Sequence, residues 1–255
     1  MSVNELVTRL ERRFTFTKKE LGYIIATVLV AAFILSFRTW GGDEFNLSVG
    51  LGNLIIMVII VFISIMIHFS IQKIIALAMG YRSEYKYWLN GILLSLIVAF
   101  FTYGYVPLFF TGSLWHEPVG KLRMGVFRGG AKHKDLGYIS FAGPLANMII
   151  AGLLAPIVLS TGNILIQNII KANLLIALFS LLPIPTFEKI RQFKGGTTGL
   201  YLFIASRWIF VLLFAAFIVY AILIWFIPTL LSLILALVVA GAITIVYYLS
   251  YESEK

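Results

Sequence analysis

Residues 50–79 read GLGNLIIMVIIVFISIMIHFSIQKIIALAM, an apolar stretch in which Lys73 is the one charged side chain. A helix of about 20 such residues crosses the ~30 Å hydrocarbon core of a bilayer, and this stretch is longer. Of the 255 residues of the chain, 60% are apolar and 12% are charged. A soluble domain carries about a quarter charged residues. The sequence therefore predicts an all-α integral membrane protein.

Further apolar runs lie on both sides of this stretch. The first is followed by Arg38-Thr39-Trp40 rather than by a small-residue cleavage site, so we expect it to be retained as a helix. Only Pro228 separates the last two runs, so a single kinked helix is the alternative to two separate helices there. The runs span 21–37, 89–110, 139–160, 164–182, 201–226 and 229–249.

Residues 1–20 are basic and differ from the rest of the chain. Apolar residues recur in them at helical spacing, so they form either a short helix on the membrane surface or a basic cytoplasmic tail. Residues 21–255 then form a single membrane domain. In a membrane protein, the net charge of +9 favours contacts with anionic lipid headgroups, and nucleic acid is not expected as a partner.

Basic residues favour the cytoplasmic side of a membrane. Seven full crossings would place the basic residues of 1–20 and those of 111–138 on opposite sides. The conflict disappears if 89–110, which contains Gly104 and Pro107, enters and leaves on the cytoplasmic side. The sequence therefore predicts six transmembrane helices and one re-entrant segment, with both termini cytoplasmic and the plasma membrane as the location.

Three short motifs follow one another in the membrane domain. The first is His68-Phe69-Ser70-Ile71-Gln72, near the end of the long apolar stretch. Gly143-Pro144-Leu145-Ala146-Asn147 comes second, and Ser180-Leu181-Leu182-Pro183-Ile184-Pro185-Thr186-Phe187-Glu188 comes third. In this order they resemble the site-2 protease family of intramembrane zinc metalloproteases, in its archaeal branch. The resemblance implies a core of that fold at about residues 50–195.

The resemblance also implies a zinc site with three ligands. In the family, the two histidines of an H-E-x-x-H motif and an aspartate of a later helix hold the metal. The corresponding positions here are His68, Gln72 and Glu188, and Phe69 stands where the family has its catalytic glutamate. A substrate groove is implied at four further positions: Asn147, Ser180, Pro183 and Pro185.

Two of these replacements remove zinc-protease chemistry. Gln72 offers a neutral amide oxygen in place of an imidazole, and Phe69 cannot take a proton from water. We therefore expect a pseudoprotease without activity and without a cofactor, which binds transmembrane segments of other membrane proteins or serves as a subunit of a membrane complex. The alternative is an active zinc-dependent intramembrane protease that uses His68 and Glu188.

The remaining polar residues have plainer interpretations. Without metal, His68 is expected to be a buried residue hydrogen-bonded to Gln72 or Glu188. His116 and His133 are expected to be solvated loop imidazoles. A polar group on the helix before Pro183 is expected to pack against other helices, with a substrate path as the alternative. This group comprises Gln167, Asn168, Lys171 and Asn173.

Overall fold

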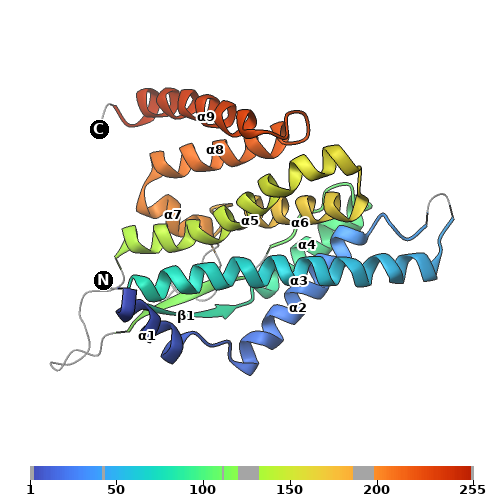
Figure 1. Ribbon diagram of the computed structural model, residues 1–255, viewed down its shortest axis with the longest axis horizontal. Coiled ribbons are helices and arrows are strands. Elements are labelled where there is room, and N and C mark those ends of the chain that lie inside the picture. Colours follow the sequence, from blue (N-terminus) through green and yellow to red (C-terminus); the bar gives the residue numbers. More distant parts are fainter. Residues whose placement is uncertain (1–2, 42–43, 111, 120–131, 186–197, 254–255) are drawn as a thin grey trace.

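The computed structural model describes residues 3–41, 44–110, 112–119, 132–185 and 198–253 (Figure 1). The chain is mostly helical, as predicted, and four of its helical stretches are long and apolar enough to cross a membrane: Lys18–Ser36, Leu47–Ala78, His133–Thr161 and Leu231–Tyr251. The elements in chain order are α1 (Val3–Arg13), α2 (Lys18–Ser36), α3 (Leu47–Ala78), β1 (Tyr81–Lys86), α4 (Leu89–Phe101), β2 (Ser113–Pro118), α5 (His133–Thr161), α6 (Ile164–Ser180), α7 (Thr198–Ala205), α8 (Arg207–Leu223) and α9 (Leu230–Tyr251).

Local sequence accounts for several helix ends. Thr17 and Glu20 form a reciprocal capping box at the start of α2, which satisfies two backbone N–H groups. Between α5 and α6, Gly162 adopts a left-handed conformation with φ 61°, and the Asn163 side chain caps α6 by accepting from the Leu165 N–H. These two residues let the chain reverse within a short turn, so that α5 and α6 pack side by side.

The central helix of the molecule is α3. It packs against α2 and β1 on one side and against α5 and α6 on the other (Figure 1). α8 contacts α6, and α9 packs along α8 as the outermost helix. The start of α1 and the end of α9 lie at the same end of the long axis, on the left of Figure 1.

Segment 89–110 leaves a small antiparallel sheet and returns to it. β1 and β2 pair so that Lys86, just before α4, is opposite Ser113. On the way back, the Phe110 N–H donates to Ser95 Oγ of α4 at 2.9 Å. This is the chain path that a re-entrant segment requires. The sheet itself was not predicted, because 111–138 was interpreted as a loop.

The structure also corrects one predicted span and decides between two alternatives. The run 201–226 is not one helix, because Ser206 adopts an extended conformation (φ −165°, ψ 117°) that separates α7 from α8. α8 and α9 are separate helices on either side of Pro228, and the single kinked helix is wrong. In the N-terminal segment, Val3–Arg13 form the helix α1.

Cysteine labelling tests whether segment 89–110 re-enters on one side. Arg82 of β1 and Glu117 of β2 are paired in the sheet, are both exposed, and lie on either side of this segment in the sequence. The chain has no cysteine of its own, so single substitutions report without background. We expect an impermeant thiol reagent to label Arg82→Cys and Glu117→Cys from the same side of the membrane. Labelling of the two positions from opposite sides would show a full crossing.

Candidate functional site: a buried polar seam on α3

Three polar residues occupy one face of α3. Ser64, His68 and Gln72 are four residues apart, which places them on successive turns. Each is buried and faces a polar group of α5 or α6. We call this set the polar seam: Ser64, His68, Gln72, Ser140, Asn147 and Asn173.

Hydrogen bonds across the polar seam hold three helices together. His68 Nδ1 lies 3.2 Å from Asn147 Oδ1, and Gln72 Nε2 donates to the Ser140 carbonyl at 3.1 Å. The Asn173 amide donates to Ser64 Oγ at 3.0 Å. With the Asn147 oxygen as acceptor, His68 carries its proton on Nδ1, and Nε2 keeps a free lone pair. The sequence predicted Gln72 or Glu188 as the partner of His68, whereas the partner among the described residues is Asn147.

Gly143 lets α5 approach the His68 ring. A Cβ atom at Gly143 would lie 2.7 to 2.8 Å from Nε2, Cδ2 and Cε1 of the imidazole. Nearly equal distances to three ring atoms place that position over the face of the ring. Asn147, one turn later on α5, is thereby brought into hydrogen-bond contact with His68. The Gly-Pro-x-x-Asn motif thus builds the contact between α3 and α5.

Gly143→Ala should therefore destabilise the protein. The added methyl group overlaps the His68 ring, and overpacking of this kind costs about 1–3 kcal/mol. Thermal unfolding of the purified protein in detergent measures the effect. Gly52→Ala on α3 is the matched control, because nothing lies within 4 Å of the added Cβ there. Equal melting temperatures for the two variants would contradict the close packing at His68.

Five atoms of the polar seam have no hydrogen-bond partner among the residues that the structure describes. They are His68 Nε2, Gln72 Oε1, Ser140 Oγ, Asn147 Nδ2 and Asn173 Oδ1. A buried polar atom without a partner costs about 1–3 kcal/mol, so the polar seam is incomplete as it stands.

The described donors of the polar seam do not fit a catalytic zinc. Such a zinc has three strong protein ligands, whereas the described part of the seam supplies one imidazole nitrogen, two neutral amide oxygens and a neutral hydroxyl. No cluster of three or more His, Asp or Glu side chains lies within metal-binding reach in the described ranges. Glu188, the predicted third ligand, lies outside the described residues.

Phe69 does not face α5 with the polar seam. Its ring lies 4.4 Å from the Tyr85 ring of β1, and the side chain is 1% exposed within the apolar core of α2, α3 and α6. Ser180 is buried at the end of α6, where its hydroxyl donates to the Ala177 carbonyl. Pro183 and Pro185 follow α6, with Pro185 exposed. No hydrogen bond joins Ser180 to the polar seam among the described residues.

A buried ion pair lies close to the polar seam and was not predicted. Lys73 Nζ of α3 is 2.7 Å from Glu20 Oε1 of α2, and both side chains are almost fully buried. The same carboxylate oxygen accepts the Tyr85 N–H at 2.6 Å, and Lys73 also donates to the Thr15 carbonyl. The pair joins α2, α3 and β1 next to the helix turn that carries Gln72. The sequence did not predict that Glu20 is buried and paired, because Glu20 belongs to the basic segment 1–20.

His116 is not the solvated loop residue that the sequence predicted. It lies on β2, where Nδ1 is 2.7 Å from Ser83 Oγ of β1, and its ring is 6.1 Å from that of Tyr201 on α7. Burial between these groups lowers the pKa of His116 to about 4. His133, at the start of α5, is exposed as predicted.

The burial of His116 predicts a pH dependence of stability. Its pKa is about 6.5 in the unfolded chain and about 4 in the folded one. As the pH falls between these values, the unfolded chain takes up a proton that the folded chain does not, so stability falls by up to about 3 kcal/mol. Unfolding measured from pH 7.5 to 4 should show a shallower slope in His116→Gln than in wild type, and part of the slope should remain because the His68 imidazole is also buried in the folded chain. His133→Gln should keep the slope, and a slope unchanged in His116→Gln would exclude His116 as its source.

Comparison of the chain with protein families, with curated proteins and with solved structures finds no match. The site therefore rests on its geometry. Sequence reasoning missed Ser64 and Ser140, and a signal for each was present. Ser64 is four residues before His68, and Ser140 is three residues before Gly143 on the same face of α5. Asn173 packs against α3, as expected for its polar group.

Proposed function

We propose that this chain is a pseudoprotease of the site-2 protease type, which binds membrane-protein segments without cleaving them. The observation that carries the proposal is the packing of the three residues that correspond to the H-E-x-x-H motif. Phe69 fills the apolar core, and the donors of His68 and Gln72 are engaged by α5. A general base typically contributes about 10²–10⁴-fold in rate, and Phe69 has no group that can act as one.

The incomplete hydrogen bonding of the polar seam supports binding of an unwound segment. Its partnerless atoms include both acceptors, such as His68 Nε2, and donors, such as Asn147 Nδ2. Extended peptide backbone carries both N–H and C=O groups and can satisfy both kinds. In a membrane such backbone is stable only against protein or water. Because the polar seam is closed in this structure, a client has to displace α5 from α3.

The proposal includes the finer topology: six transmembrane helices, a re-entrant segment 89–110, cytoplasmic termini and the plasma membrane. It is supported by the return of β2 to β1 and by the position of α1 and the end of α9 at one end of the molecule. Most basic residues then face the cytoplasm and its anionic lipids.

Binding of model transmembrane peptides tests the proposal. We expect a single-span helix interrupted by a central Gly-Pro pair to bind the protein in nanodiscs at least about tenfold more tightly than an uninterrupted polyleucine helix, which is ~1.4 kcal/mol. Fluorescence energy transfer between labelled peptide and protein measures this. Asn147→Leu should abolish the preference, and Thr244→Val, a buried hydroxyl of α9, should not. Equal affinity for both peptides would overturn the binding role.

The second candidate is the zinc-dependent protease that uses His68 and Glu188. The free lone pair on His68 Nε2 favours it. Metal analysis of the purified chain separates the two candidates. One zinc per chain, with cleavage of the Gly-Pro peptide that His68→Ala abolishes, would replace the pseudoprotease by the enzyme.

A further inference from the structure

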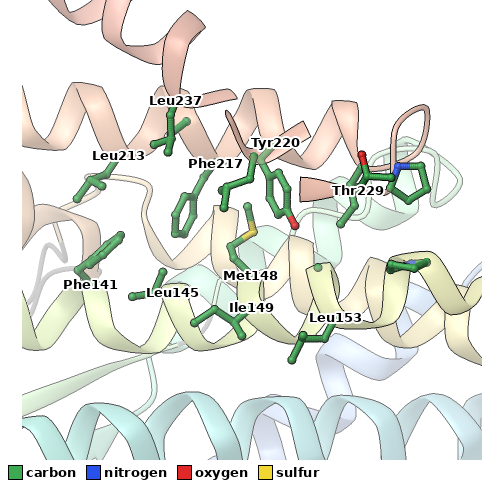
Figure 2. Close-up of a pocket in the computed structure, with 16 residues that line it drawn as sticks. Phe141, Leu145, Met148, Ile149, Leu153, Leu213, Phe217, Tyr220, Thr229 and Leu237 are labelled. Atoms are coloured by element: carbon green, nitrogen blue, oxygen red, sulfur yellow. The ribbon is translucent and has the colours of Figure 1, made fainter. Parts of the chain in front are cut away.

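A groove opens on the side of the bundle, away from the polar seam. It lies between α5 and the α8–α9 pair and has a volume of about 590 Å³ (Figure 2). Phe141, Leu145 and Ile149 of α5 face Leu213 and Phe217 of α8 across it. Ile149 is 52% exposed, so the groove is open to the surroundings of the bundle, which in a membrane are lipid chains. We call it the lateral groove.

The length of the lateral groove fits a hydrocarbon chain. Its α5 wall runs from Phe141 to Pro156, about 22 Å at 1.5 Å per residue. The length exceeds the ~15 Å of one leaflet, half of a ~30 Å core, so one acyl chain can lie along it.

Positive charge lies at one end of the lateral groove. α5 and α8 both begin on the left of Figure 1, and a Cβ at Gly137 of α5 would lie 2.6 Å from Ala205 Cβ, next to the start of α8. Lys134 and Arg207 are exposed there, and neither forms an ion pair with another described residue. Arg207 is six residues before Leu213, the first α8 residue of the groove, a distance of about 9 Å along the helix.

Aromatic residues mark this end as the membrane interface. Tyr138 of α5 and Trp208 of α8 are both largely exposed. Exposed tyrosine and tryptophan side chains concentrate at the level of lipid headgroups. A phosphate at this level is near both long cationic side chains, and the acyl chain attached to it can extend into the apolar groove.

We propose that the lateral groove binds one acyl chain of an anionic phospholipid, whose phosphate contacts Arg207 and Lys134. Two features then select the ligand: the cations favour an anionic headgroup, and the apolar groove accepts an acyl chain. The bound lipid also fills the space between α5 and α8 and so links the α8–α9 pair to the rest of the bundle. This inference goes beyond the proposed function and does not depend on it.

Native mass spectrometry of the full-length protein tests the proposal. Protein extracted from nanodiscs of phosphatidylcholine with phosphatidylglycerol should retain one phosphatidylglycerol per chain, and little phosphatidylcholine. Ile149→Trp, which fills the groove from an exposed position, should lower retention at least fivefold. The double variant Lys134→Gln, Arg207→Gln should remove the preference for phosphatidylglycerol.

Matched controls change similar residues elsewhere. Ile59→Trp is on α3 at an exposed position outside the groove, and Arg12→Gln, Arg13→Gln removes two exposed charges of α1. Both should retain lipid like wild type. If Ile149→Trp does not fold, Leu145→Phe provides a smaller filling change. Equal retention in the groove-filling variant and wild type would overturn the proposal, as would equal retention of both lipids by wild type. Displacement of the lipid by free inorganic phosphate would overturn the role of the acyl chain.

Discussion

Lys73→Met is expected to unfold much of the protein. The change leaves the Glu20 carboxylate 1% exposed and without the cation that lies 2.7 Å from it. Removal of one partner of a buried ion pair costs about 3–5 kcal/mol, which is a large fraction of the 5–15 kcal/mol that stabilises a typical protein. The yield of folded protein and its melting temperature in detergent measure the loss.

Two further variants show whether an uncompensated charge is the cause. Lys73→Met combined with Glu20→Gln should recover part of the loss, since a neutral amide can still accept the Tyr85 N–H. Glu5→Gln, which removes a carboxylate from the exposed pair with Arg9, should cost less than about 1 kcal/mol. If Lys73→Met is no more harmful than Glu5→Gln, the buried pair does not stabilise the fold.

The long apolar helices were predictable because each one is recognisable from its own run of apolar residues. The run 50–79 became Leu47–Ala78, and 164–182 became Ile164–Ser180. A helix in a membrane satisfies its backbone within itself, so its position follows from local composition. The break at Ser206 was missed because a single serine between apolar residues leaves hydropathy almost unchanged.

Contacts between distant segments were harder to predict. Tyr81-Arg82-Ser83-Glu84-Tyr85-Lys86 alternates between inward and outward residues, which is a strand pattern that sequence reasoning could have used. Its partner strand begins 27 residues after Lys86, and no local signal identifies it. The same holds for the polar seam. Three motifs in order indicated that α3 and α5 meet, but the partner of His68 depends on how closely Gly143 lets the helices pack.

Introduction of the zinc-protease motif at positions 69 and 72 should separate metal binding from folding. Gln72→His adds a second imidazole one turn after His68, on the face that meets α5. Two imidazoles are a better donor set for zinc than one imidazole and an amide, so we expect this single variant to fold and to hold more zinc than wild type. Zinc per chain is measured on protein purified without added metal.

Phe69→Glu should instead prevent folding, alone or combined with Gln72→His. The position is 1% exposed, and its neighbours include the Tyr85 ring and the apolar core around Ile65. A carboxylate there has no cation to pair with among the described residues, since Lys73 is taken by Glu20. Effects above about 4 kcal/mol arise from unpaired buried charges of this kind. Phe69→Leu, which keeps the site apolar, should cost about 1–2 kcal/mol.

Positions 69 and 72, which the proposed function compares with the zinc-protease motif, thus differ in how well they tolerate the residues of that motif. At Gln72 the change concerns one ligand on a polar face, and the helix contact with Ser140 can accommodate an imidazole. At Phe69 the core of α2, α3 and β1 packs around a benzyl group, so a carboxylate cannot be introduced there without repacking Tyr85. A double variant that accumulates in the membrane and cleaves a transmembrane peptide would contradict this account. So would wild-type protein that holds one zinc per chain and loses it in His68→Ala, because the polar seam would then be a working metal site.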